Sequence, residues 1–362
     1  MARHTDVVED FICNSENPRY NRDYRLWRRH TKTPFIYRYA GDSGENVYVE
    51  GGTAVHEDAE EAERHALMHC SMLIGFVMLV YLVIYLLGGT VLNTVLRLFG
   101  ADVHMDFLTF SWSETGAHVL LNFLKYAVPA TILLRSAKIP KRVALPVHFA
   151  APPELFAAFG MGMVIAGIHC LTARQADVEL SQRLYTYKSG LAVLFYGAVE
   201  VLVMPVLAEL LMRGGIFQLL RQFGDGFAIV STAAISFLCP NTLPDRISLL
   251  LIGLACSYLL MRSGSIVKCV LLRAVYGALV YAKLVLVYAN DLMPLWQYTL
   301  LLFAVGTLLS AAFVRVRRNE LKPDNACTAL GMYQKLQAAT QTVTTLPWLA
   351  VSAILTLLQL FY

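Results

Sequence analysis

Blocks of about 20 consecutive apolar residues recur along this chain of 362 residues. A helix of about 20 apolar residues is long enough to cross the hydrocarbon core of a bilayer. Hydrophobic residues make up 57% of the chain and charged residues only 15%, whereas the apolar share of soluble domains is ~45–50%. The chain lacks the alternating segments of ~10 residues that a membrane barrel requires. The sequence therefore predicts an all-α fold, a polytopic membrane bundle of about eight or nine transmembrane helices.

The apolar blocks also predict where the chain crosses the membrane. They cover residues 66–87, 115–134, 153–172, 190–207, 227–239, 248–261, 266–289, 294–314 and 345–361. The fourth block continues as a helix toward residue 220, and the fifth and sixth are short. The chain then divides into a polar cytoplasmic N-terminal tail (1–65), N-terminal transmembrane helices (66–188), a core (189–290) and C-terminal transmembrane helices with a basic linker (291–362).

Lys and Arg residues near the ends of the spans predict the orientation, because cytoplasmic loops carry an excess of them. Basic residues cluster in the tail, between the second and third spans, and after the eighth span: Arg19 to Lys32; Arg135, Lys138, Lys141 and Arg142; Arg315, Arg317, Arg318 and Lys322. With eight spans before the last cluster, all three lie on one side. We expect a multi-pass protein of the cell membrane with a cytoplasmic N-terminus, although Arg174, Arg183 and Lys188 after the third span weaken the pattern.

The first basic cluster mixes arginines with aromatic residues in the sequence RYNRDYRLWRRHTK, from Arg19 to Lys32. Such clusters attract the negative cytoplasmic leaflet of a membrane, so we expect membrane lipid as a partner and no nucleic acid. The alternative is a solvated tail that only fixes the topology.

The cysteines and histidines predict neither a metal site nor a cofactor. The seven cysteines are an odd number, contain no CxxC and lie mostly in or beside apolar blocks. Small apolar packing residues explain this placement better than a disulfide framework or a zinc site. His65 and His69 have the spacing of a metal pair, but no third ligand shares their face, and a hydrated helix end is the simpler interpretation.

The stretch AELLMRGG places an acid and a base inside an apolar block. Glu209 and Arg213 are four residues apart, so their side chains lie on one face of a helix and can pair. Burying either alone in lipid costs several kcal/mol, and ionisable groups within a membrane indicate a functional site. Pro205 predicts a kink before the pair, and the glycines after it permit close helix contact or a break. The alternative is a cytoplasmic helix end.

Three further charged residues lie in the same half of the chain. Arg273 is eight residues inside an apolar block and cannot lose its charge, so it requires a carboxylate or several carbonyl groups, and we expect it to share Glu209 with Arg213. Lys268 is expected to extend its ammonium group to the membrane interface. Glu200 lies nine residues before Glu209, about 180° around the helix, and is not expected to replace a missing acid.

Three motifs in this region resemble those of the CPBP family, the CAAX-protease and bacteriocin-processing (Abi) intramembrane endopeptidases. The stretch from Pro205 to Gly214 is similar to the family element P-x-x-E-E-x-x-x-R-G, with Ala208 at the first glutamate. Phe237-x-x-x-Asn241 stands where the family has F-x-x-x-H, and Arg273-x-x-x-Gly277 stands where it has H-x-x-x-N. The resemblance covers residues 190–285, so residues 189–290 form a CPBP-like core, and it implies a bacterial plasma membrane.

The positions to which the resemblance assigns chemistry are substituted. In the family the first glutamate activates water, the first histidine holds the water or a metal, and the asparagine stabilises the oxyanion. The residues at these positions and at the second histidine are Ala208, Asn241, Gly277 and Arg273, which leaves Glu209 and Arg213 as the matching family residues. Alanine cannot act as a general base. No histidine follows His169, and we interpret His118, His148 and His169 as isolated residues that do not build a distant half-site.

The first functional hypothesis is a catalytically inactive member of this family. It would bind a membrane peptide, prenylated or bearing a leader, or regulate a membrane protein partner. The second is an active intramembrane endopeptidase with a remodelled site that uses Glu209. The third is a transporter, or a subunit of one, in which Glu209, Arg213 and Arg273 form an intramembrane charge network. The sequence has no inverted repeat that would favour the third.

Overall fold

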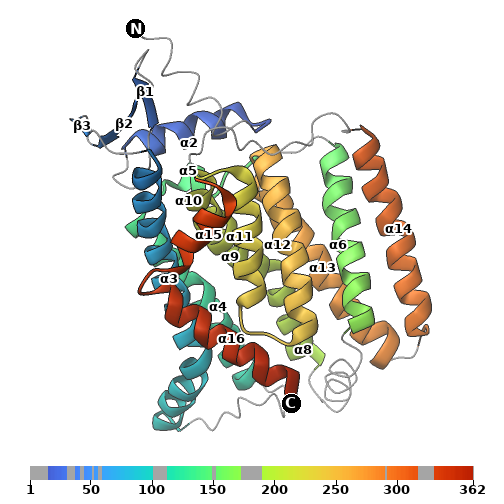
Figure 1. The fold of residues 1–362 in the computed structure, drawn as a ribbon. Coiled ribbons are helices and arrows are strands. Elements are labelled where there is room, and N and C mark those ends of the chain that lie inside the picture. Colours follow the sequence, from blue (N-terminus) through green and yellow to red (C-terminus); the bar gives the residue numbers. More distant parts are fainter. Residues whose placement is uncertain are drawn as a thin grey trace.

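The computed structural model describes residues 15–30, 37–40, 45–50, 53–55, 59–100, 112–148, 152–172, 190–289, 292–316 and 330–361. These residues form a bundle whose long helices run side by side between two ends (Figure 1). Seven helices in the described part are long and apolar enough to cross a membrane, or eight if one bent pair is a single span. The predicted all-α polytopic membrane fold is confirmed.

The elements follow the predicted blocks closely. The main helices are α3 (Ala59–Leu98), α4 (Trp112–Ser136), α6 (Pro152–Thr172), α11 (Asp225–Leu238), α12 (Leu243–Ser263), α13 (Ile266–Lys283) with its π-helical extension η4 (Leu284–Ala289), α14 (Leu295–Val316), α15 (Met332–Thr340) and α16 (Thr345–Phe361). Between α6 and α11 runs one helix of five segments: α8 (Gly190–Ala198), η2 (Val199–Val203), α9 (Met204–Glu209), η3 (Leu210–Ile216) and α10 (Phe217–Arg221).

Two of the nine predicted spans differ from full crossings. Helix α11 has 14 residues and is ~21 Å long, shorter than the ~30 Å hydrocarbon core of a bilayer. Helices α15 and α16 meet at 91°, so the last predicted span is one arm of a bent pair. This explains why seven or eight candidate spans replace the eight or nine predicted.

The polar N-terminal tail contains structure that the sequence did not predict. Helix α2 (Pro18–His30) is followed by three strands: β1 (Tyr37–Ala40), β2 (Glu45–Glu50) and β3 (Thr53–Val55). The strands form an antiparallel sheet in the order β1-β2-β3, with Tyr37 opposite Tyr48 and Tyr48 opposite Val55. The sheet is small, and the fold remains helical.

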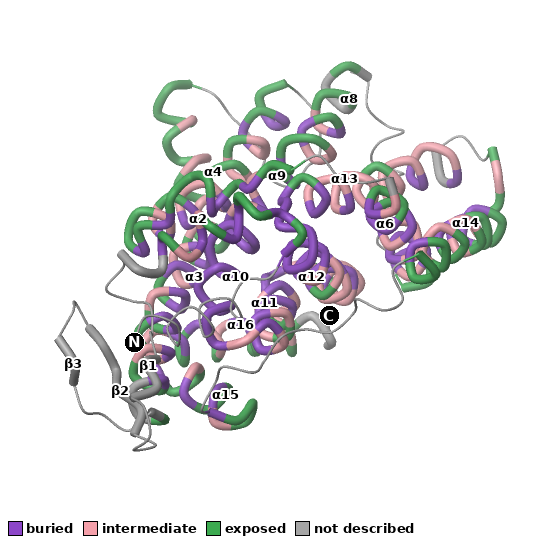
Figure 2. The backbone as a smooth tube through the Cα atoms, turned by 90° about the horizontal axis from the view of Figure 1, so that it is seen from above, coloured by how far each residue is buried: buried purple, intermediate pink, exposed green. Residues whose placement is uncertain are grey.

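Buried residues concentrate where α9 to α12 meet, whereas α6 and α14 form a pair at one edge of the bundle (Figure 2). Small residues allow the helices to approach closely, as is usual in membrane bundles. A Cβ added to Gly253 of α12 would lie 2.7 Å from Ala233 Cα of α11. A Cβ added to Gly306 of α14 would lie 3.0 Å from the Gly160 carbonyl oxygen of α6. This packing fixes the helices that carry the charged residues.

Candidate functional site

The helix that carries Glu209 and Arg213 changes its winding on both sides of the acid. Pro205 has no N–H to donate, and it lies in the short segment α9 between the π-helical segments η2 and η3. π-helical turns inside α-helices occur frequently at functional sites. The helix continues through Pro205 and through the double glycine, and α10 follows directly. The proline is thus accommodated by altered winding within a continuous helix.

Glu209 lies between two guanidinium groups, and its exposed fraction is 0%. Arg213 Nε is 3.2 Å from Glu209 Oε2, and Arg273 Nη1 is 3.2 Å from Glu209 Oε1. Arg213 Nη1 also donates to Oε1 at 3.4 Å. The prediction that Arg273 shares Glu209 with Arg213 is confirmed. The carboxylate is enclosed by these two cations and has no exposed surface through which it could reach a substrate.

Arg213 is fixed from a second side by the backbone of α12. Its Nη2 donates to the carbonyl oxygens of Ile252 at 3.2 Å and Gly253 at 2.9 Å. The Gln218 side chain in turn donates to the Arg213 carbonyl at 3.1 Å. Arg213 is fully buried, so its role in the structure is to join the helix of Glu209 to α12.

A cavity of about 390 Å³ lies beside this ion-pair cluster. Its lining comes from α4, the helix of residues 190–221, the beginning of α12, and α13. The polar members are Asn122, Lys125, Tyr126, Tyr196, Glu200, Asn241, Asp245, Arg273, Tyr276 and Tyr281. Of the six positions matched to the family motifs, Asn241, Arg273 and Gly277 line the cavity, whereas Ala208, Glu209 and Arg213 do not. Arg273 alone among the six touches both the cavity and Glu209.

Glu200 is the carboxylate that the sequence interpretation undervalued. It is turned away from Glu209, as the nine-residue spacing predicts, and this orientation places it in the cavity wall. Asn122 Nδ2 donates to Glu200 Oε1 at 2.8 Å, and Lys125 Nζ donates to Asn122 Oδ1 at 3.0 Å. Asn122 and Lys125 carried no signal in the sequence beyond being polar residues in an apolar block. The cavity therefore holds an acid supported by an amide and an ammonium group.

His169 is not isolated in space, which corrects the interpretation from the sequence. Its Nδ1 lies 3.2 Å from the Tyr276 hydroxyl, 3.4 Å from Ser248 Oγ and 3.7 Å from Asp245 Oδ1. Tyr276 and Asp245 line the cavity, while His169 is buried behind them on α6. Residues from a span outside the motif region thus support the cavity wall.

The environment of Lys268 also differs from the predicted one, in which its ammonium group reaches the membrane interface. It is buried, with 1% of its surface exposed, and it pairs with Glu154 in the first turn of α6. The ammonium group is buried between helices because a carboxylate on the neighbouring helix is within reach.

Two cysteines approach Glu209 closely enough to suggest a metal site. The ligand atoms of Glu209, Cys256 and Cys269 lie within 4.8 Å of one another. Each thiol, however, contacts the backbone of the other residue: Cys256 Sγ is 3.6 Å from the Cys269 oxygen, and Cys269 Sγ is 3.1 Å from the Cys256 oxygen. Each thiol is thus engaged with a backbone carbonyl, and the two arginines already neutralise Glu209. We therefore interpret these three side chains as packing groups and not as ligands of a cation.

The glycines of the motifs predict contrasting effects of substitution. A Cβ added to Gly214 would lie 2.6 Å from the Ala144 carbonyl oxygen, whereas one added to Gly277 meets nothing closer than 3.9 Å. We expect Gly214→Ala to destabilise the protein by ~1–3 kcal/mol through overpacking, and Gly277→Ala to leave stability unchanged or raise it by ~0.5 kcal/mol. Thermal unfolding of the two variants in detergent tests this contrast. Equal unfolding midpoints for the two variants would show that α5 moves to accommodate the added methyl group.

A comparison with protein families bears on this same region. Residues 190–279 match the family model described as Type II CAAX prenyl endopeptidase Rce1-like. These residues are CAAX-protease-like, and the described chain has several candidate membrane spans. The match covers about a quarter of the chain and includes all six motif positions, from Ala208 to Gly277. Searches of curated proteins and of solved structures found no match. The family resemblance and the multi-pass membrane location are thus confirmed, while the orientation and the bacterial origin stay predictions.

Proposed function

We propose that this CAAX-protease-like protein binds a membrane peptide in the cavity between α4, the helix of residues 190–221 and α13 without cleaving it. The observation that carries the proposal is the state of Glu209. This acid remains at the family motif, yet it is fully buried, paired with two arginines, and absent from the cavity wall. A general base must reach the proton that it abstracts. Glu209 is buried outside the cavity and cannot reach such a proton, and Ala208 has no ionisable group.

The cavity wall is suited to holding a peptide. Ten polar residues share it with seven apolar ones, so a peptide would meet hydrogen-bonding groups as well as apolar surface. Glu200 and Asn241 can bind peptide N–H groups, and Arg273 can bind a carbonyl or a carboxylate. By its relation to CAAX proteases, the ligand would be a prenylated or leader-bearing peptide, and the protein would regulate or accompany a membrane protein partner.

The proposal is tested with a photoactivatable prenylated peptide and the full chain in lipid nanodiscs. We expect covalent capture of the peptide without cleavage products by mass spectrometry. Gly277→Leu should fill the cavity and lower capture by about tenfold, on the order of 1.4 kcal/mol. Gly116→Leu is the matched control, because nothing lies within 4 Å of a Cβ at Gly116, and it should capture as wild type does. Equal capture by Gly277→Leu would contradict peptide binding in this cavity.

The position of Glu200 favours one second candidate, an active endopeptidase. The carboxylate of Glu200 lines the cavity, so Glu200 rather than Glu209 would activate water there. Cleavage products in the same assay that disappear in Glu200→Gln would establish this candidate and refute the non-cleaving proposal. A transporter is less well supported, because Glu209 and Arg213 are sealed from the cavity and a charge relay through them has no path.

A further inference from the structure

Helix α2 lies across one end of the bundle (Figure 1). Its buried face carries Tyr20, Tyr24 and Trp27, which are spaced four and three residues apart. The Tyr24 hydroxyl donates to the Gln218 carbonyl at 3.0 Å, and Trp27 Nε1 donates to the Ala137 carbonyl at 3.3 Å. These bonds fix the rotation of α2, so its other face is held outward.

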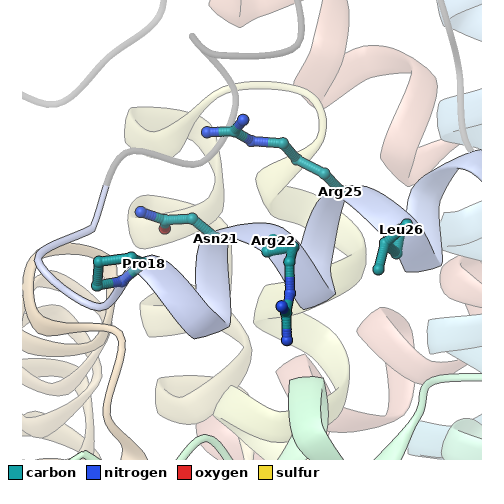
Figure 3. A pocket seen from close by; sticks show the side chains of 5 residues that line it. All are labelled: Pro18, Asn21, Arg22, Arg25 and Leu26. Atoms are coloured by element: carbon teal, nitrogen blue, oxygen red, sulfur yellow. The ribbon is translucent and has the colours of Figure 1, made fainter.

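The outward face of α2 is basic with an apolar residue among the charges. Pro18, Arg19, Arg22 and Leu26 are exposed, with 67% of the Arg22 side chain and 44% of Leu26 accessible. A hollow of about 400 Å³ is lined by Pro18, Asn21, Arg22, Arg25 and Leu26 among the described residues (Figure 3). The side chains of Arg22 and Arg25 extend in different directions in Figure 3. The charges are thus spread over a surface and do not converge on one small anion.

The basic surface continues onto the turn after α4. Trp27 reaches the Ala137 carbonyl in this turn, which leads into the short helix α5 (Lys141–Ala144). Four exposed basic residues lie there: Arg135, Lys138, Lys141 and Arg142. The candidate span of α4 ends at Ser136, so these groups lie at the level of the lipid headgroups. Within the described part of the surface, Asp23 Oδ1 lies 3.6 Å from Arg22 Nε and partly neutralises its charge.

We propose that the outward face of α2 and the α4–α5 turn together bind anionic phospholipid headgroups. The occupant follows from two features. The surface is strongly basic, and its α4–α5 part lies where a candidate spanning helix ends. Basic clusters next to spanning helices attract anionic lipids, and salt weakens the attraction. A nucleic acid would use the same charges, but the adjacent end of a membrane span favours lipid.

The test is native mass spectrometry of the detergent-solubilised full chain with phosphatidylserine or phosphatidylcholine. We expect wild type to retain phosphatidylserine several-fold more than phosphatidylcholine, and less so as salt rises. The variant Arg19→Gln, Arg22→Gln, Lys141→Gln, Arg142→Gln should lose this preference. Its matched control, Arg19→Lys, Arg22→Lys, Lys141→Arg, Arg142→Lys, keeps every charge and should retain it. Because all four residues are exposed, both variants should unfold at the wild-type temperature.

Three results would overturn the proposal. The first is an unchanged preference in the glutamine variant, and the second is no preference in wild type. The third is displacement of phosphatidylserine by a short single-stranded oligonucleotide at micromolar concentration, which would assign the surface to nucleic acid.

Discussion

Glu209→Gln is expected to destabilise the folded protein severely, regardless of any effect on activity. The substitution removes the carboxylate that lies 3.2 Å from both Arg213 and Arg273. Arg213 has an exposed fraction of 0% and cannot lose its proton, so it would stay charged in the core without a counter-ion. Removal of one partner from a buried ion pair costs ~3–5 kcal/mol. We expect the apparent Tm in nanodiscs to fall by roughly 10 °C.

Glu200→Gln is the matched control for this experiment. It makes the same isosteric change on the same helix, but Glu200 lines the cavity, where water or a ligand can replace the lost interaction. We expect its apparent Tm to lie within a few degrees of wild type, with an effect of about 1 kcal/mol or less. Equal midpoints for Glu209→Gln and wild type would show that the buried carboxylate is not needed to balance the arginines. If the large fall is found, lost activity in Glu209→Gln alone would not identify a catalytic acid.

The helical bundle and the ion-pair cluster could be predicted because both follow from the cost of burying polar groups in lipid. An apolar block of about 20 residues has few solutions other than a helix. Arg273 inside such a block needs a carboxylate, and Glu209 was the nearest intramembrane acid that also matched a motif. The pairing of Glu209 with Arg213 therefore followed from charge and spacing, and the addition of Arg273 followed from its charge and the motif resemblance.

The cavity could not be predicted, because it depends on which face of each helix meets its neighbours. Glu200 and Asn122 come from helices far apart in sequence and meet across a packed interface. His169 was wrongly interpreted for the same reason, since its partners Tyr276 and Asp245 lie on α13 and α12. The π-helical segments around Pro205 also change the angle between successive side chains, and a proline alone does not specify this winding.

Lys268→Met is expected to give the second large loss of stability. The lysine is buried in the first turn of α13, where the positive end of the helix dipole disfavours a cation. Glu154 in the first turn of α6 compensates for both the charge and the dipole. Without Lys268, this carboxylate stays buried with its main cation gone, at a cost of ~3–5 kcal/mol. Thermal unfolding in nanodiscs should show a fall in apparent Tm comparable to that of Glu209→Gln.

A double substitution separates the charge imbalance from the loss of packing. Lys268→Met with Glu154→Leu removes both charges and keeps similar side-chain volumes, so its apparent Tm should recover most of the difference. Apolar replacement of a whole buried ion pair is often neutral or stabilising, whereas breaking it is costly. A double variant no more stable than Lys268→Met would mean that Glu154 stabilises the fold through its other contacts. If the double variant recovers the lost stability, the α6–α13 contact depends on the balance between the two charges. That balance then explains why Lys268 remains inside the bundle.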